Sequence, residues 1–207
     1  MQTIMEVTMK IFLIRHGEDD ERYKGGWNRL PLINRGKKQV SKLANYLAKR
    51  QKDFKIEKIV SSDILRTRQT AKIINNKLHL PIEFTRKLRE MNNGVLAGMR
   101  VKDAIKQYPG VYFRALKMDE RYPGGESPIE FKERVIKSFN ELLEENKDHE
   151  TVAFVTHNGV INVICSHITG KVWTNKVRNF KADYASLTII NITEDSKEVE
   201  LTNFKAR

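Results

Sequence analysis

Hydrophobic residues gather in four short runs along the chain. The runs lie at residues 10–14, 56–60, 151–156 and 185–192, and they are rich in β-branched and aromatic side chains. Nearly continuous apolar runs of this length are typical of strands buried on both faces, as in a parallel sheet. The pattern therefore predicts a central sheet.

Helical spacing fills the segments between these runs. Residues 36–50 and 64–78 each carry one apolar stripe, and residues 127–130 read Ser-Pro-Ile-Glu, a capping box with proline at the first helical position. The apolar residues of the helix that follows are Phe131, Val135, Phe139 and Leu142. This alternation predicts an α/β fold with a mostly parallel central sheet, helices on both faces in three layers, and one domain over residues 1–207.

One long segment breaks the alternation. Residues 95–125 are less periodic and richer in glycine, proline and aromatic residues than their surroundings. We expect this excursion from the sheet to roof a pocket.

The charge balance narrows the class of partner. The 207 residues include 38 Lys and Arg against 26 Asp and Glu, a formal net charge of +12. Such a surplus favours phosphorylated small molecules, nucleic acid or a membrane surface. No nucleic-acid motif is found and the basic residues interleave with acidic ones, so no nucleic-acid partner is expected. Cys165 is the single cysteine, which excludes an internal disulfide and a cysteine-cluster metal site.

Targeting signals are also missing from the pattern. Residues 1–10 lack a basic start, a long apolar stretch and a small-residue cleavage site, and no apolar run is long enough to cross a bilayer. We expect no signal peptide, no membrane partner and a cytoplasmic location.

Candidate chemistry lies where three predicted strands end. Arg15 and His16 follow the first, Ser62 ends the second with Arg66 just beyond, and His157 follows the third. Ligands of open α/β sheets bind beyond the carboxyl ends of the strands. Guanidinium groups suit phosphate oxygens, and a neutral histidine can accept a phosphoryl group. Positioned cations would dominate such a transfer, so we expect neither a metal nor a cofactor.

Six motifs in order then indicate a family. They are Arg-His-Gly-Glu at 15–18, Gly-Trp at 26–27, the segment 61–71 beginning Ser-Ser-Asp, Leu-Arg-Glu at 88–90, Pro-Gly-Gly-Glu-Ser at 123–127 and Thr-His-Asn-Gly-Val at 156–160. Over residues 9–192 the chain resembles the histidine phosphatase superfamily in its phosphoglycerate-mutase-like branch. The tripeptide Arg-His-Gly alone is a weak signal, whereas six motifs in the same order are a strong one.

The resemblance implies a role for each matching residue. His16 would take the phosphoryl group, while Arg15 and Arg66 would clamp its oxygens. His157 would bind the same oxygens and stabilise the group in transfer. Glu90 would protonate the leaving alkoxide and later activate water.

The chain also departs from the family pattern. Glu18 is an alternative acid, and the acidic residues 19–21 stand beside a phosphate site, where we expect them to point outward or to select a positively charged substrate. Arg22 occupies a position where relatives often carry asparagine, so it is a candidate phosphate ligand. Gly26 and Asn158 complete the expected substrate-binding set.

Alternative interpretations remain for several of these residues. The alternative for Glu90 is an ordinary salt bridge with Arg86 or Arg89, which we favour less than the acid role. Trp27 is either a pocket wall or a hydrophobic plug, and Arg121 and Tyr122 of the excursion are candidate substrate contacts.

Three functions are compatible with the pattern. The favoured one is a phosphatase that hydrolyses an anionic small-molecule phosphate monoester through a phosphohistidine at His16. The alternative is a mutase that returns the phosphoryl group to a second oxygen, although the excursion is short for the longer insert that such mutases carry. A non-catalytic module that binds phosphate or nucleic acid is the third.

Overall fold

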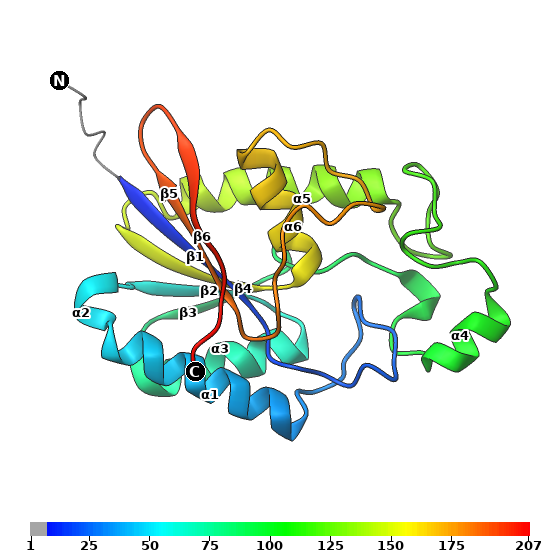
Figure 1. Ribbon diagram of the computed structural model, residues 1–207, viewed down its shortest axis with the longest axis horizontal. Helices are drawn as coiled ribbons and strands as arrows, with labels where there is room; N and C mark the ends of the chain where they lie inside the picture. Colours follow the sequence, from blue (N-terminus) through cyan, green and yellow to red (C-terminus); the bar gives the residue numbers. More distant parts are fainter. Residues whose placement is uncertain (1–7) are drawn as a thin grey trace.

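A six-stranded sheet runs through the molecule, with helices on both of its faces (Figure 1). The computed structural model describes residues 8–207. The strands are β1 (Met9–Arg15), β2 (Lys58–Ser62), β3 (Ile82–Thr85), β4 (Thr151–Thr156), β5 (Leu187–Ile192) and β6 (Lys197–Phe204). The helices are α1 (Asn34–Lys49), α2 (Gln51–Phe54), α3 (Leu65–Leu78), the 3-10 turn η1 (Gly94–Leu96), α4 (Val101–Gln107), α5 (Pro128–Glu145) and α6 (Asn158–Ile168).

The sheet is mostly parallel. Its strand order is β3-β2-β4-β1-β5-β6; the first four strands in this order run parallel, and β5 and β6 join in antiparallel pairs. The predicted fold class is therefore confirmed. The run at 185–192 does form a strand, β5, but it runs antiparallel to β1, unlike a strand of a purely parallel sheet.

Alternating side chains of the central strands divide the core into two layers. Ile11 and Leu13 of β1 pack on one face with the apolar stripes of α5 and α6. Phe12 and Ile14 point to the other face, where they meet the stripes of α1 and α3. A buried strand covered on both sides needs apolar residues at every position, which is why β1 and β4 read as continuous runs.

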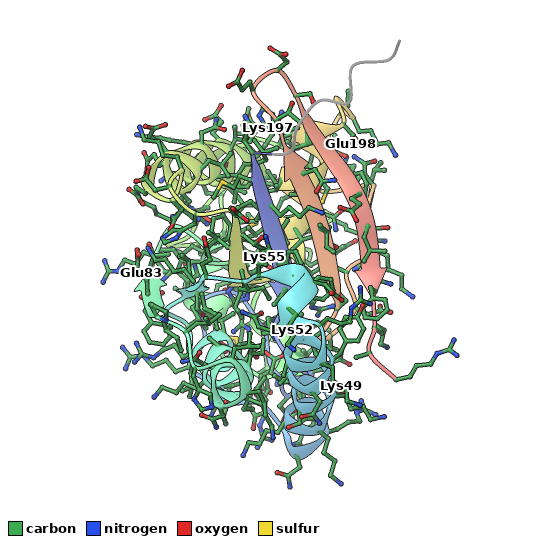
Figure 2. The ribbon with its side chains drawn as sticks, turned by 90° about the vertical axis from the view of Figure 1, so that its left-hand side faces the viewer. Lys49, Lys52, Lys55, Glu83, Lys197 and Glu198 are labelled. Carbon is green, nitrogen blue, oxygen red and sulfur yellow. The ribbon has the colours of Figure 1, made fainter. Side chains whose placement is uncertain are left out.

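Two strands were not predicted, and both are sheet edges. β3 has four residues, and along β6 exposed positions alternate with partly buried ones. An edge strand with one covered face has no continuous apolar run for the sequence pattern to reveal. Figure 2 shows Glu83 on β3, and Lys197 and Glu198 on β6, charges that discourage pairing with another chain.

The excursion at residues 95–125 begins within η1, carries α4, and ends just before α5 (Figure 1).

The capping box at the start of α5 is formed as predicted: Ser127 accepts a hydrogen bond from the Glu130 backbone, and the Glu130 side chain accepts one from the Ser127 backbone. None of the helices within residues 8–207 is both long enough and apolar enough to span a bilayer.

Candidate active site

Two histidines meet because β1 and β4 are parallel neighbours in register. Arg15 is paired with Thr156, so both strands end at the same level. The His16 backbone N–H then donates to the Thr156 carbonyl at 3.0 Å. One residue further, the His16 and His157 rings lie edge to face with centroids 5.1 Å apart. The strand-end pattern thus brings the two imidazoles to one edge of the sheet.

His16 is held as one tautomer. Its Nδ1 lies 2.7 Å from the Gly17 carbonyl, which can only accept a hydrogen bond, so Nδ1 carries the proton. Nε2 therefore keeps its lone pair, and it accepts a hydrogen bond from Arg66 Nε at 3.2 Å. Burial, followed by the charges of Arg66 and Arg15, lowers the pKa of His16 well below its ordinary value. The imidazole is thus neutral, with its nucleophilic nitrogen turned toward a guanidinium.

Arg66 lies at the centre of a cluster that it forms with Arg15, His16 and His157. It stands in the first turn of α3 and is 2% exposed. Its terminal nitrogens donate to Asn28 Oδ1 at 3.0 Å, to the Gly26 carbonyl at 2.8 Å and to His157 Nδ1 at 3.1 Å. Four acceptors, including His16, hold this buried cation in one geometry, which satisfies a charge that would otherwise be costly to bury.

Close packing explains the glycine at position 26. Gly26 has a φ of +63°, and a Cβ there would lie 1.9 Å from Asn93 Oδ1. Only glycine places its carbonyl against Arg66 without strain or collision. Asn28, two residues on, was not among the predicted site residues. It follows the Gly-Trp pair directly, and that adjacency is its one sequence signal.

Arg15 is held differently from Arg66. Its Nη1 donates to the Ala182 carbonyl at 2.7 Å, and its guanidinium lies 3.7 Å from the centroid of the Tyr184 ring. Its Nε is buried without a hydrogen-bond partner among residues 8–207. A buried donor left unpaired is unfavourable, so this N–H is available to an anion oxygen. Tyr184 was missed by the motif analysis because it comes from a loop outside all six motifs.

His157 is fully buried at the N-cap of α6. Since Arg66 can only donate, His157 Nδ1 accepts, and Nε2 carries the proton that reaches Ser62 Oγ at 3.1 Å. Burial and then the Arg66 charge lower the pKa of His157 well below its ordinary value. The positive charge of the site therefore comes from Arg15 and Arg66, and His157 adds polarity without charge.

Glu90 lies in the loop after β3, against the start of α6. Its Oε2 accepts from the Gly159 backbone N–H at 3.0 Å, and Oε1 accepts from Met91 N–H at 3.1 Å. The Glu90 carbonyl accepts from Trp27 Nε1 at 2.7 Å and from Arg134 at 3.2 Å. Both the carboxylate and its backbone are thus fixed beside the cluster.

The alternatives for Glu90 and Trp27 have different outcomes. Arg89 pairs with Asp63 at 2.5 Å, and within residues 8–207 neither Arg86 nor Arg89 forms an ion pair with Glu90. Trp27 is a pocket wall: it lines a surface pocket with Asp63 and Arg89, lies 4.6 Å from the Arg89 guanidinium, and its indole N–H donates to the Glu90 carbonyl. A Cβ on Gly159 would lie 2.3 Å from Glu90 Oε1, so the glycine leaves the room that this carboxylate occupies.

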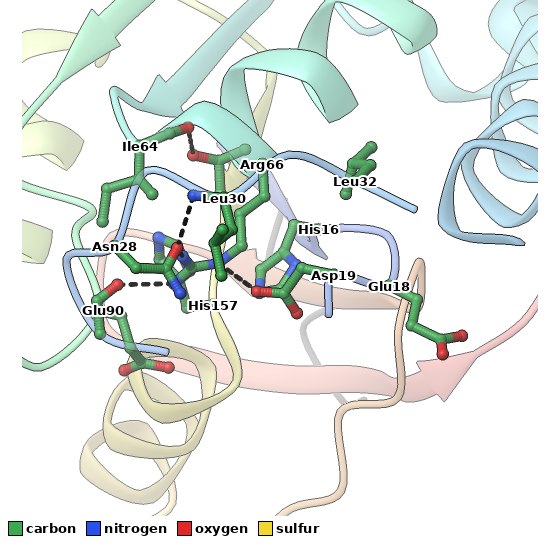
Figure 3. Close-up of polar contacts among 12 residues, drawn as sticks. His16, Glu18, Asp19, Asn28, Leu30, Leu32, Ile64, Arg66, Glu90 and His157 are labelled. Carbon is green, nitrogen blue, oxygen red and sulfur yellow. Dashed lines mark hydrogen bonds and ion pairs between the residues drawn. The ribbon is translucent and has the colours of Figure 1, made fainter. Parts of the chain in front are cut away.

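Glu18, the alternative acid, points away from the cluster. Arg35 forms a bidentate ion pair with it, and Gln39 Nε2 donates to it at 3.0 Å. Hydrogen bonds from Arg35 lower the pKa of Glu18, which opposes a role as proton donor. In Figure 3 Glu18 lies on the side of His16 away from Glu90.

The side chains of the acidic loop after Glu18 point in different directions. Arg22 is 83% exposed and pairs with Asp20 at 2.6 Å, so the structure does not bring it to the cluster. A partner two residues away holds its guanidinium at the surface. Glu21 accepts a hydrogen bond from the Tyr184 hydroxyl at 3.0 Å. Asp19 contradicts the outward prediction: it is buried, with Oδ2 3.6 Å from Arg66 Nε.

A small cavity of about 200 Å³ opens beside Glu90. Its lining residues are Gly26, Glu90, Met91, Asn93, Phe113, Tyr122, Phe131, Asn158 and Gly159. Tyr122 and Phe113 come from the predicted excursion. Burial, and then the Glu90 charge, raise the pKa of Tyr122 to about 12, so its hydroxyl stays protonated as a donor. Asn158 lines this cavity, at the first position of α6.

The assembled groups suit phosphoryl chemistry. A neutral imidazole nitrogen faces two buried guanidinium groups, and a carboxylate stands between this cluster and an open cavity. Cations held at fixed positions stabilise the negative charge on a transferring phosphoryl group. Within residues 8–207 no group of three or more His, Cys, Asp or Glu side chains has a geometry that could hold a metal ion.

This chain is similar in sequence to a family of phosphatases and mutases. A model of the histidine phosphatase superfamily (branch 1) matches residues 11–205. A broad-specificity phosphatase of Saccharomyces cerevisiae is 28% identical over 201 residues, which cover 92% of this chain and 82% of that protein. A probable phosphoglycerate mutase of Escherichia coli is 33% identical over 171 residues, covering 78% and 75%.

The solved structures agree in fold. The α-ribazole phosphatase of Shigella flexneri superposes with a TM-score of 0.82 at 23% identity, over 96% of this chain and 98% of that one. With the family model spanning nearly the whole chain and its motif residues gathered in one cluster, this protein belongs to the histidine phosphatase superfamily, branch 1.

Proposed function

We propose that the protein is a phosphatase that hydrolyses small-molecule phosphate monoesters through a phosphohistidine at His16. The observation that carries the proposal is the state of that ring. Nδ1 is committed to the Gly17 carbonyl, and Nε2 presents its lone pair next to Arg66. Such a ring attacks phosphorus without first having to lose a proton.

In the first step His16 Nε2 attacks the phosphorus atom of the ester. The P–N bond forms as the bond from phosphorus to the ester oxygen breaks. The unpaired Arg15 Nε and the Arg66 guanidinium bind the phosphoryl oxygens. Glu90 gives its proton to the leaving oxygen, so the alcohol departs neutral and Glu90 becomes a carboxylate.

In the second step water replaces the alcohol. Glu90 takes a proton from the water as its oxygen attacks phosphorus, and the P–N bond breaks. Inorganic phosphate leaves, His16 Nε2 recovers its lone pair, and Glu90 is protonated for the next cycle. The backbone N–H groups of Met91 and Gly159 hold the Glu90 carboxyl group in place through both steps.

His157 responds to the substrate. Arg66 donates to its Nδ1. An incoming phosphate dianion withdraws Arg66 toward its own oxygens and raises the pKa of the imidazole, since a nearby anion favours the protonated form. His157 then becomes a further cationic donor to the phosphoryl group.

The cavity beside Glu90 is the place for the alcohol part of the ester. Met91, Phe113 and Phe131 give it an apolar wall, and Glu90 is the charged residue among those that line it. The names of two similar proteins, a broad-specificity phosphatase and an α-ribazole phosphatase, support hydrolysis of an organic phosphate.

A mutase is the second candidate, favoured by the 33% identity to a probable phosphoglycerate mutase. It shares the first step and differs in the acceptor, which is a second hydroxyl of the bound alcohol. The two functions are separated by assaying phosphate release from p-nitrophenyl phosphate and isomerisation of 3-phosphoglycerate in parallel. Phosphate release without isomerisation supports the phosphatase, and isomerisation at a comparable rate overturns it.

The covalent step is tested by trapping. We expect a rapid alkaline quench during turnover of a labelled ester to retain protein-bound phosphate that is stable in base and labile in acid. His16→Ala should abolish the trapped phosphate and lower turnover by several orders of magnitude. His167→Asn, which changes an exposed histidine of α6, is the matched control and should trap phosphate normally. Equal activity of the two variants would end the assignment.

A further inference from the structure

Asp19 is a buried carboxylate inside the cationic cluster. Its side chain is 12% exposed, and Oδ2 lies 3.6 Å from Arg66 Nε, the same nitrogen that donates to His16 (Figure 3). Within residues 8–207 the Asp19 carboxylate receives no hydrogen bond from a side chain or backbone N–H. It is therefore paired through charge alone, at a distance longer than a hydrogen bond.

The backbone, and not an optimal ion pair, directs Asp19 inward. Asp19 forms an isolated antiparallel bridge with Leu32, and the Ile33 N–H donates to the Glu18 carbonyl at 3.0 Å. The start of α1 closes against this loop so tightly that a Cβ on Gly36 would lie 2.1 Å from the Glu18 carbonyl oxygen. Position 19 is thus held facing the site whatever side chain it carries.

The charged and neutral groups around Asp19 determine how its carboxylate affects phosphate binding. Arg66 and Arg15 are the cations, and Tyr184 and His16 are neutral neighbours of the same cluster. A phosphate ion bound to Arg66 lies within a few ångströms of the Asp19 carboxylate. Two anions at such a separation repel strongly where water is excluded, so Asp19 opposes every phosphate that binds there.

We propose that Asp19 sets the affinity of the site for phosphate groups: it is a resident counter-anion on Arg66 that weakens phosphate binding and so limits product retention. This inference rests on the proposed function. Asp19 adds a negative charge next to Arg66, beside the charge of Glu90, and it keeps the released phosphate from blocking the next cycle.

The effect is predicted on binding more than on chemistry. The ester and the product phosphate occupy the same place on Arg66, so Asp19 weakens both. An interaction that changes ground states and transition state alike alters KM and the inhibition constant of phosphate together while leaving kcat nearly unchanged. A residue with a merely structural role would not produce this division.

The test measures inorganic phosphate binding by calorimetry with Asp19→Asn. This variant keeps the shape of the side chain and removes its charge. We expect its Kd for phosphate to fall about tenfold, roughly 1.4 kcal/mol, with a parallel fall in KM and little change in kcat. Asp19→Ser should show the same direction. Asp20→Asn, the adjacent substitution at the residue that pairs with Arg22, should bind phosphate within about twofold of the native chain.

Each other outcome overturns a definite statement. Equal or weaker phosphate binding by both position-19 variants, with thermal unfolding midpoints near the native value, would overturn the inference and leave the proposed function intact. A native chain that neither binds phosphate nor hydrolyses any ester would overturn the proposed function, and the inference with it.

Discussion

The phosphate cluster and the neighbouring cavity are built on different principles, although Glu90 belongs to both. In the cluster Arg66 alone has four hydrogen-bonded acceptors, and both imidazoles are fixed as single tautomers. In the cavity the walls are mostly apolar, and Asn93 Oδ1 is buried without a partner within residues 8–207. Most polar groups of the cluster already have hydrogen-bond partners within the protein, whereas the cavity offers few polar groups.

Under the proposed function, the difference follows from what each region would recognise. A phosphoryl group is always the same tetrahedral anion, and a preorganised set of donors avoids reorganisation during the reaction. The alcohol part varies between substrates, and an apolar wall discriminates weakly, by a small factor for each methylene group. We therefore expect substitutions in the cluster to affect all substrates, and those in the cavity to affect some.

The largest expected effect is in the cluster. Arg66→Lys keeps the charge but not the fork that reaches both imidazoles, Gly26 and Asn28. We expect kcat/KM to fall about 10²- to 10³-fold for every ester, because one fixed donor to a developing charge is worth that much. Arg68→Lys, two residues along α3 and stacked on Phe84, is the control and should stay within about twofold. Equal losses in the two variants would contradict the comparison.

The next effect lies at the boundary of the two regions. Glu90→Gln cannot donate a proton to the leaving oxygen, so esters of weakly acidic alcohols should lose about 10²-fold or more in kcat. In phosphoenzyme formation, the loss for p-nitrophenyl phosphate should be below tenfold, since its leaving group departs without a proton, whereas the later water step slows alike for every ester. Rapid-quench rates of phosphoenzyme formation from alkyl and aryl phosphates measure this difference. A uniform loss across the series would argue that Glu90 only positions α6.

The cluster should also make stability depend on pH. The pKa values of His16 and His157 lie well below 6.5 in the folded chain, so below about pH 6.5 the unfolded chain binds more protons than the folded one. Stability is therefore fully present above that pH and falls as the solution becomes more acidic, by about 1.4 kcal/mol per pH unit for each histidine until the folded pKa is reached. Denaturant unfolding of the native chain and of His157→Asn checks this, and a steeper acid loss in the variant would refute it.

The smallest effect belongs to the cavity wall. Phe113→Ala removes apolar surface from the excursion and leaves the cluster untouched. We expect KM to rise by a few-fold for esters with bulky apolar alcohols and to change little for small ones, while the inhibition constant of inorganic phosphate stays constant. A changed phosphate inhibition constant would show that the two regions are coupled.

The pattern of apolar residues along the chain predicted much of the fold and the central residues of the site. β1 and β4 are buried on both faces, so their apolar runs are continuous, and Arg15, His16 and His157 follow directly from where those runs end. Their meeting requires only that neighbouring parallel strands finish at one edge of the sheet. The edge strands β3 and β6 were not predicted, because a strand with only one buried face needs no continuous run of apolar residues.

Tertiary structure decided the direction of each loop side chain. Asp19 and Arg22 lie three residues apart in one acidic loop, yet the bridge to Leu32 turns Asp19 onto Arg66, while Asp20 holds Arg22 at the surface. Tyr184 reaches Arg15 from a segment far along the chain. Apolar periodicity is a property of neighbouring residues, so the sequence alone determined the layers and strand ends. The charge balance around the phosphate site depends on backbone contacts between distant segments, and only the folded chain determines those.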